Sequence, residues 1–221
     1  MIFDRVIWSN GFDNQIEIAF SKFFDMLPSF LKNLIVSFSA LNQIGLFAIG
    51  IAIILLFIKK TRKLGIVMIV SLMITVIFDD LIFKNIFNRA RPYEDPELLP
   101  YLVSITNNGG KVYEIVPTSS SFPSGHTSSA FCIFGGSLFY YLFENKEDRK
   151  FNLRFMIFFL VYAILMGLTR ILLSHHYATD VIAGMITGTI YGCGGYFATI
   201  GSIKLFKYIK DKKPKMNQEN I

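Results

Sequence analysis

The stretch LGIVMIVSLMITVIFDDLIFKNIF, Leu64 to Phe87, decides the class of fold. A helix needs about 20 mostly apolar residues to cross a bilayer, and this stretch meets that length with only three charged side chains, Asp79, Asp80 and Lys84. A charge inside a span costs at least about 2.5–3.5 kcal/mol on insertion scales, so each one needs a structural or functional reason. The stretch therefore predicts a membrane-spanning helix with unusual polar positions near one end.

The composition of the whole chain agrees with lipid as its solvent. Of the 221 residues, 52% are hydrophobic and 17% are charged, against about 25% charged in an average soluble domain. Phe alone occurs 23 times. These values argue against a disordered chain, a disulfide-stapled secreted scaffold and an ordinary water-soluble enzyme. The net charge of +6 is therefore interpreted through its position along the chain, and no nucleic-acid partner is expected.

Four further stretches are free, or nearly free, of charge and predict spans of their own. They are residues 33–58, 127–143, 155–174 and 181–203. The predicted fold is thus all-α, a polytopic membrane helix bundle with five clear transmembrane helices. Gln15 to Lys32 alternates apolar and charged residues, which favours an amphipathic helix in the interface, with a sixth span as the alternative. The expected organisation is an N-terminal helix region (1–32), a membrane domain (33–209) and a basic tail (210–221).

Basic residues alternate along the connections and predict an orientation. They cluster in residues 59–63, 146–154 and 204–215, which the positive-inside rule places in the cytoplasm. Residues 88–126, with a turn at Asn107–Gly110, and residues 174–179 then face outward. Binding of anionic lipid headgroups is an alternative role for the basic tail. No basic start followed by an apolar run occurs in Met1–Asn10, so no cleavable signal peptide is expected.

Several polar residues gather at the predicted outer ends of the spans. Lys84 and Arg91 are seven residues apart, which places them on one side of a helix about 10 Å apart, with Pro92 ending that helix. Arg89 lies off that line and is interpreted as a solvated charge, while Asp80 offers Lys84 a purely structural partner. His176 and Asp180 are four residues apart, so the carboxylate can hold the imidazole if both are helical.

The second polar cluster is Pro123-Ser124-Gly125-His126, which opens a predicted span. A turn of this kind points backbone N–H groups and the positive end of the helix dipole at one place, an arrangement that binds anions. Together with Lys84, Arg91 and Arg170, it predicts a phosphate site. A zinc site is the alternative, but three cations would repel a dication, and Cys132 and Cys193 fall inside spans, where we expect packing roles. No metal or cofactor is expected.

These residues resemble the motifs of the type 2 phosphatidic acid phosphatase superfamily, which also contains vanadium haloperoxidases. Lys84 with Arg91-Pro92 is similar to its first motif, Pro123 to His126 to the second, and Arg170, His176 and Asp180 to the third. The order and spacing of all three match from about Leu64 to the end of the last span. Thr169 stands where the third motif usually has Ser, and the family usually has six membrane helices.

The resemblance implies a role for each residue. His176 would be the nucleophile that forms a phosphohistidine, Asp180 would orient it, and His126 would protonate the leaving oxygen. The phosphate would be held by Lys84, Arg91, Ser124, Gly125 and Arg170. His175 has no implied role and is treated as a flanking polar residue.

The expected function is a metal-independent phosphatase in the cell membrane, acting on its outer face. Polyprenyl diphosphate, such as undecaprenyl diphosphate, is the favoured substrate by analogy and topology. Alternatives are a phosphatidate or phosphatidylglycerophosphate phosphatase, a lipid phosphotransferase with the same intermediate, and a lipid-phosphate binder or flippase. A vanadate-dependent haloperoxidase is disfavoured because a soluble chain would be expected. The sequence does not predict an oligomeric state.

Overall fold

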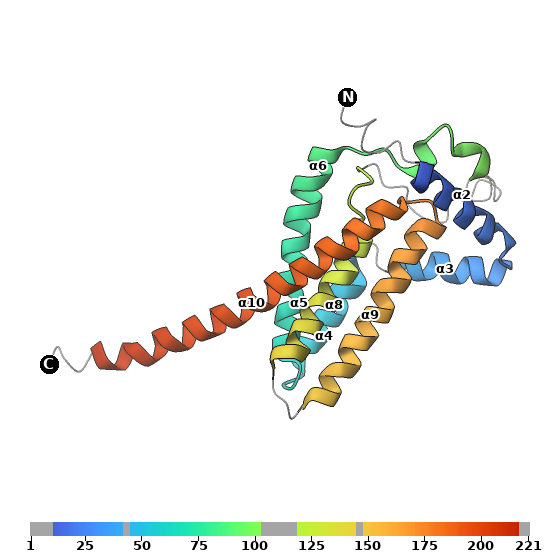
Figure 1. The fold of residues 1–221 in the computed structure, drawn as a ribbon. Coiled ribbons are helices and arrows are strands. Elements are labelled where there is room, and N and C mark those ends of the chain that lie inside the picture. Colours follow the sequence, from blue (N-terminus) through green and yellow to red (C-terminus); the bar gives the residue numbers. More distant parts are fainter. Residues whose placement is uncertain (1–10, 42–44, 103–118, 145–147, 217–221) are drawn as a thin grey trace.

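The structure is a computed structural model, and it describes residues 11–41, 45–102, 119–144 and 148–216. This part of the chain is helical and contains no strand, which confirms the predicted all-α class. The predicted turn at residues 107–110 lies outside the described residues. The main helices are α2 (Gly11–Met26), α3 (Ser29–Leu41), α4 (Leu46–Phe57), α5 (Arg62–Thr75), α6 (Lys84–Phe87), α8 (Gly125–Phe143), α9 (Arg149–Leu172) and α10 (Ala178–Met216) (Figure 1).

Short elements complete the described part of the chain. A π-helical segment, η2 (Val76–Phe83), joins α5 to α6. Two 3₁₀ turns, η3 (Pro92–Glu94) and η4 (Leu99–Tyr101), follow α6. π-helical turns are rare and are frequently found at functional sites, and this one directly precedes Lys84.

Helix α8 lies at the centre of the bundle, packed by α5, α9 and α10 (Figure 1). The α8–α10 contact depends on glycines at every fourth position of α10, namely Gly184, Gly188 and Gly192. A Cβ added at Gly188 would lie 2.3 Å from the carbonyl oxygen of Ser128, and one at Gly192 would lie 2.4 Å from that of Cys132. Small residues at this spacing let membrane helices approach closely, because lipid supplies no hydrophobic force between them.

The prediction of five clear spans is not confirmed. Three described segments are long and apolar enough to cross a membrane, Arg62–Glu94, Arg149–Leu172 and Ala178–Lys212. The predicted span at residues 33–58 is instead divided between α3 and α4, which are inclined by 58° and make a fourth span only if they are counted together. The predicted span at residues 127–143 is helical, but it is not among these segments. Its first turns carry Thr127, Ser128 and Ser129, which are buried against other helices and not against lipid.

The sequence predicted an amphipathic helix in the interface for Gln15 to Lys32, and the buried face of helix α2 is mainly polar. Its buried positions are Asp13, Glu17, Ser21 and Phe24, all on one stripe, whereas Phe12 is exposed. With 16 residues, α2 is too short to span, so the described part of this region does not support a sixth span. Helices α2 and α3 lie across the end of the bundle where α9 ends and α10 begins (Figure 1).

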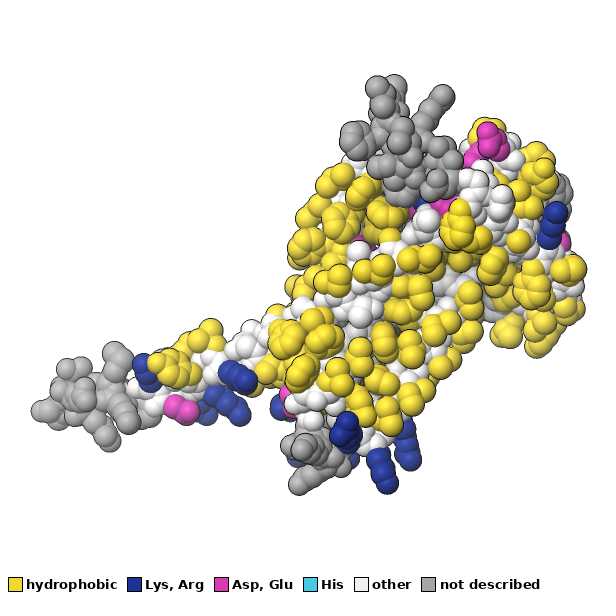
Figure 2. Space-filling view, viewed as in Figure 1, with side chains coloured by type: hydrophobic (Ala, Val, Ile, Leu, Met, Phe, Trp, Pro, Cys, Tyr) yellow, Lys and Arg dark blue, Asp and Glu magenta, His cyan; other side chains and the backbone are white. Residues whose placement is uncertain are grey.

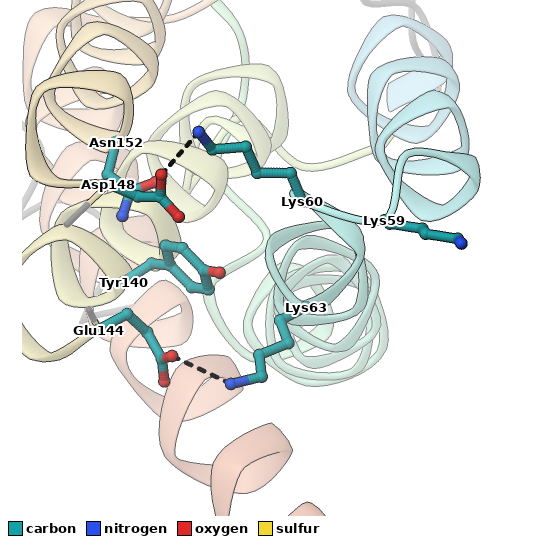
Figure 3. A pocket seen from close by; sticks show the side chains of 7 residues that line it. All are labelled: Lys59, Lys60, Lys63, Tyr140, Glu144, Asp148 and Asn152. Carbon is teal, nitrogen blue, oxygen red and sulfur yellow. Dashed lines mark hydrogen bonds and ion pairs between the residues drawn. The ribbon is translucent and has the colours of Figure 1, made fainter.

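The opposite end of the bundle is basic. Lys60 pairs with Asp148 at 2.6 Å and Lys63 pairs with Glu144 at 3.1 Å, while Lys59 points away from both acids (Figure 3). The pairs join the first turn of α5 and the turn before it to the region where α8 ends and α9 begins. Their side chains are partly exposed, so each contributes at most about 1 kcal/mol to stability. Apolar side chains cover the flank of the bundle between the two ends (Figure 2).

Candidate active site

The turn between α9 and α10 carries two adjacent histidines, His175 and His176. Their backbone N–H groups both donate to the carbonyl oxygen of Arg170, at 3.0 and 3.2 Å. Ser174 accommodates the reversal with φ of 53°. Both imidazoles are buried. The end of α9 thus fixes the backbone of the turn before any side chain contributes.

The hydrogen bonds of His176 define its tautomer. Nδ1 lies 2.7 Å from the carbonyl oxygen of Ser121. A carbonyl only accepts, so Nδ1 must carry the proton, and in the neutral ring Nε2 keeps its lone pair. Nε2 lies 3.2 Å from a guanidinium nitrogen of Arg91. Burial lowers the pKa of His176 well below 6.5, and the charges of Arg91, Arg170 and Lys84 lower it further.

Asp180 lies beside His176, as expected, but it does not hold the ring by a direct hydrogen bond. Its Oδ2 is 3.8 Å from Nδ1. The same oxygen accepts hydrogen bonds from Ser121 Oγ at 2.5 Å and from the Tyr177 backbone at 3.0 Å. Helix α10 begins at Ala178, so the helical argument for the pair was wrong although their proximity was right. Ser121, which the sequence prediction missed, contacts both partners.

Arg91 reaches the site from an extended segment and not from a helix. Helix α6 ends at Phe87, and Asn88 has φ of 38°, so the chain leaves the helix before Pro92. The seven-residue argument that aligned Lys84 with Arg91 was therefore wrong. The guanidinium is 2% exposed. It donates to the carbonyl oxygens of Ser119 at 3.0 Å and His175 at 2.9 Å, in addition to facing His176.

Arg170 supplies a second buried guanidinium. It is 1% exposed, and one of its nitrogens lies 3.2 Å from Nδ1 of His175. Since the carbonyl of His175 accepts from Arg91, His175 contacts both arginines. His175 thus packs among the predicted site residues while it flanks His176 in the chain.

Lys84 meets the second motif at the start of α8. Its ammonium forms an ion pair with Asp80, as the structural alternative anticipated. A Cβ added at Gly125 would lie only 3.3 Å from Lys84 Nζ, so the glycine allows the cation to approach the helix start. The predicted helix start at this turn is confirmed: Ser124 precedes α8 in an extended conformation. Its Oγ lies 2.9 Å from Thr127 Oγ1 and makes no capping hydrogen bond to the backbone.

His126 lies in the first turn of α8, ahead of the segment predicted to span. Burial lowers its pKa, and the charges of Arg170 and Lys84 lower it further. The three motifs, separate in sequence, therefore converge on one place at one end of the bundle. Three cations there face two neutral imidazoles, a setting that favours a tetrahedral oxyanion.

Arg89 was interpreted as a solvated charge, and that interpretation was wrong. Its side chain is 4% exposed and forms ion pairs with Asp13 of α2 and Asp180 of α10. Its Cζ lies 4.0 Å from the centre of the Tyr177 ring. The left-handed turn at Asn88 redirects the chain, and no helical pattern in the sequence would reveal this contact.

Among the described residues, no group of three or more His, Cys, Asp or Glu side chains could hold a metal ion. The donor set around His176 is instead dominated by guanidinium and ammonium groups, which repel a metal cation. The geometry therefore fits anion binding by fixed side chains.

The chain was compared with known proteins. It is similar to an undecaprenyl-diphosphatase of Sulfolobus acidocaldarius, 27% identical over 141 residues, which cover 64% of this chain and 58% of the relative. It is also similar to a lipid A 1-phosphatase of Rhizobium etli, 30% identical over 151 residues, 63% of this chain and 54% of the relative. The chain thus spans a little over half the length of these curated relatives.

A solved structure shares the fold. It is the transmembrane PAP2 type phosphatidylglycerolphosphate phosphatase from Bacillus subtilis, with a TM-score of 0.64 and 22% identity, covering 92% of this chain and 91% of that one. The profile of the PAP2 superfamily matches residues 60–199, which include all three motifs. Together with the convergence of those motifs, this match shows that the chain belongs to the PAP2 superfamily.

Proposed function

We propose that this protein is an integral membrane phosphatase that hydrolyses the phosphate or diphosphate headgroup of a lipid through a phosphohistidine at His176. One observation carries the proposal. The unprotonated Nε2 of His176 lies 3.2 Å from Arg91, and the charges of Arg91, Arg170 and Lys84 all act on that imidazole. A nucleophilic lone pair and three phosphate-binding cations thus share one place.

In the first step, the Nε2 lone pair attacks phosphorus while the bond from phosphorus to the leaving oxygen breaks. His126 donates a proton to that oxygen. Bound phosphate favours the protonated form of His126, because the negative charge of the phosphate opposes burial and the nearby cations, which lower the pKa of His126. Asp180 and the Ser121 carbonyl stabilise the charge that develops on His176.

In the second step, water attacks the phosphorus of the phosphohistidine. His126 takes a proton from the water, the bond between Nε2 and phosphorus breaks, and inorganic phosphate leaves. Phosphoryl transfer relies mainly on positioning and on charge stabilisation. Lys84, Arg91 and Arg170 supply both, with the backbone N–H groups at Gly125 and the Ser124 turn beside them.

The favoured substrate is a polyprenyl diphosphate such as undecaprenyl diphosphate. The site lies at the end of a helix bundle with an apolar flank, so a lipid can enter sideways while its headgroup reaches the cations. Relatives named as undecaprenyl-diphosphatase and lipid A phosphatase support a lipid headgroup. A phosphatidate or phosphatidylglycerophosphate phosphatase and a lipid phosphotransferase are the alternative functions.

We also propose that the site faces outward. The cluster of Lys59, Lys60 and Lys63 lies at the opposite end of the bundle, and basic ends stay in the cytoplasm. A membrane-impermeant thiol reagent should label a cysteine placed at Asn108 in intact cells, and one placed at Lys59 only after lysis. The reverse pattern would invert the orientation.

The test of function is phosphate release by the purified protein from undecaprenyl diphosphate, phosphatidate, phosphatidylglycerophosphate and diacylglycerol pyrophosphate. His176→Ala should abolish release while the protein stays folded with a lower melting temperature, because the buried carbonyl of Ser121 loses its partner. Lys59→Ala serves as the matched control at the other end. Normal turnover by His176→Ala would disprove the nucleophile. Label from a radioactive headgroup that appears in a lipid acceptor, with little free phosphate, would favour the phosphotransferase.

A further inference from the structure

The buried stripe of α2 points acidic side chains at the turn that carries His176. Asp13 is 2% exposed. Its Oδ1 accepts from the backbone N–H of Thr179 at 3.1 Å, and its Oδ2 accepts from Thr179 Oγ1 at 2.5 Å. The N-terminal helix is therefore attached to the first turn of α10, one residue from Asp180.

Arg89 connects this helix to Asp180 itself. One guanidinium nitrogen lies 2.7 Å from Asp13 Oδ2, and the other contacts both Thr179 Oγ1, at 2.8 Å, and Asp180 Oδ1. Oδ1 of Asp180 is thus fixed by Arg89, while Oδ2 accepts a hydrogen bond from Ser121 Oγ and faces the imidazole of His176. The guanidinium determines which oxygen of Asp180 is turned toward the ring.

The backbone of Arg89 also positions Ser121, the second residue that contacts the imidazole of His176. Its carbonyl accepts from the N–H of Ser121 at 2.8 Å, and its N–H donates to Ser120 Oγ at 2.9 Å. The carbonyl oxygen of Ser121 in turn accepts a hydrogen bond from Nδ1 of His176. Of the two groups beside Nδ1 of His176, Asp180 is thus held by the side chain of Arg89, and Ser121 by its backbone, which Arg89→Gln keeps.

The charges at this junction do not cancel. Arg89 is shared between two carboxylates, Asp13 and Asp180. Glu17 lies one turn further along α2 and is fully buried. Burial is the main reason why the pKa of Glu17 is raised to about 8, and the charges of Asp13 and Asp180 raise it as well. Glu17 is therefore mostly neutral at pH 7. One net negative charge then remains for His176.

We propose that Asp13 and Arg89 are positioning residues for the reaction at His176, so that α2 belongs to the catalytic apparatus. Arg89 fixes the Asp180 carboxylate and the Ser121 support. Asp13 shares the charge of Arg89, which leaves Asp180 free to stabilise positive charge on the imidazole. The inference deepens the proposed function and rests on it.

The test measures kcat, KM and the pH dependence of kcat/KM for Asp13→Asn, Arg89→Gln and the double variant. Asp25→Asn, an exposed acid on the same helix, is the matched control. The other charged or titratable groups around His176 stay constant in all variants: Lys84, Arg91, His126, Arg170, His175, Glu17, Tyr177 and Asp180. We expect each single variant to lose at least tenfold in kcat, with KM changing less than threefold.

The acid limb of the pH profile of kcat/KM should move in opposite directions in Asp13→Asn and Arg89→Gln. Asp13→Asn removes a negative charge, so the pKa of His176 falls and the limb moves to lower pH. Arg89→Gln removes a positive charge, so the limb moves to higher pH. In the double variant the two shifts should largely cancel. A merely structural role for α2 would lower activity without shifts of opposite sign.

Variants that keep or lose the charge separate electrostatics from folding. Asp13→Glu should recover most of the kcat that Asp13→Asn loses, and melting temperatures should show that the variants are folded. The inference is overturned if Asp13→Asn matches Asp25→Asn, or if Asp13→Glu is as impaired as Asp13→Asn. Failure of the wild-type protein to release phosphate from any lipid phosphate would instead refute the proposed function.

Discussion

Replacing Arg91 by lysine keeps the positive charge but removes the planar fork, and so tests whether geometry or charge holds the phosphate. The guanidinium donates to two carbonyl oxygens, those of Ser119 at 3.0 Å and His175 at 2.9 Å, and also faces His176 Nε2. Lysine offers a single ammonium in place of five fixed donors. It cannot reach two carbonyls on different segments and also face the nucleophile.

The expected loss follows from those contacts. A buried acceptor left without its partner costs about 1–3 kcal/mol. Arg91→Lys leaves at least one of the two carbonyls unsatisfied, so unfolding should become easier by about 1–3 kcal/mol. If a similar amount is lost in the transition state, kcat falls by about fivefold to 150-fold, since about 1.4 kcal/mol corresponds to a factor of ten.

The assay is phosphate release by the purified variant, with a melting curve in the same detergent. Arg62→Lys is the matched control, because Arg62 is exposed and donates to the carbonyl of Leu56 at the other end of the bundle. It should retain wild-type kcat and melting temperature. Wild-type kcat and KM in Arg91→Lys would refute the reasoning that the fork, and not the charge alone, organises the site.

Three further predictions follow from the same structure. The pKa values of His175 and His176 lie below about 6.5 in the folded protein, so the unfolded chain binds more protons in acid. Stability measured by denaturation should therefore fall as the pH drops through 6.5. A rise in stability would contradict the burial of neutral imidazoles. Phosphate release should survive excess EDTA, and loss that zinc or magnesium restores would revive a metal site. Gly188→Ala should destabilise the bundle by about 1–3 kcal/mol in thermal melts, because its Cβ meets the backbone of Ser128 at 2.3 Å, whereas Gly194→Ala, whose nearest neighbour lies at 3.7 Å, should not.

The helical class was predictable from the sequence, but the number of spans was not. Hydropathy reports whether a helix by itself is apolar enough to lie in lipid, and it does not report which other helices surround it. Ser128 and Ser129 could enter the bundle because α8 is enclosed by other helices. Residues 33–58 carry no charge, yet the chain changes direction between α3 and α4. Asn42, Gln43 and Gly45 interrupt the apolar run at this place, and a search for charged residues alone does not detect them.

The site was predictable to the extent that motif spacing reflects convergence. Lys84, Arg91, Arg170 and His176 were identified correctly as neighbours, although the helical geometry offered for Arg91 was wrong. Arg89 and Asp13 were missed because their contact joins residues 76 apart in the sequence. An acid and a base at that separation show no periodicity, so only the three-dimensional structure reveals the pair.

The convergence itself depends on polar ties that lie outside the proposed chemistry. Asp79, buried within the predicted span, accepts from Ser128 of α8 and from Tyr191 of α10, the latter at 2.9 Å. A buried acid is costly in a membrane, but here it joins the helix that carries Lys84 to the two helices that carry His126 and Asp180. The backbone N–H of Ser124 adds a second tie, to the carbonyl of Asp180 at 3.1 Å. Since the cations at the site repel one another, such ties help to hold the helices that carry them together.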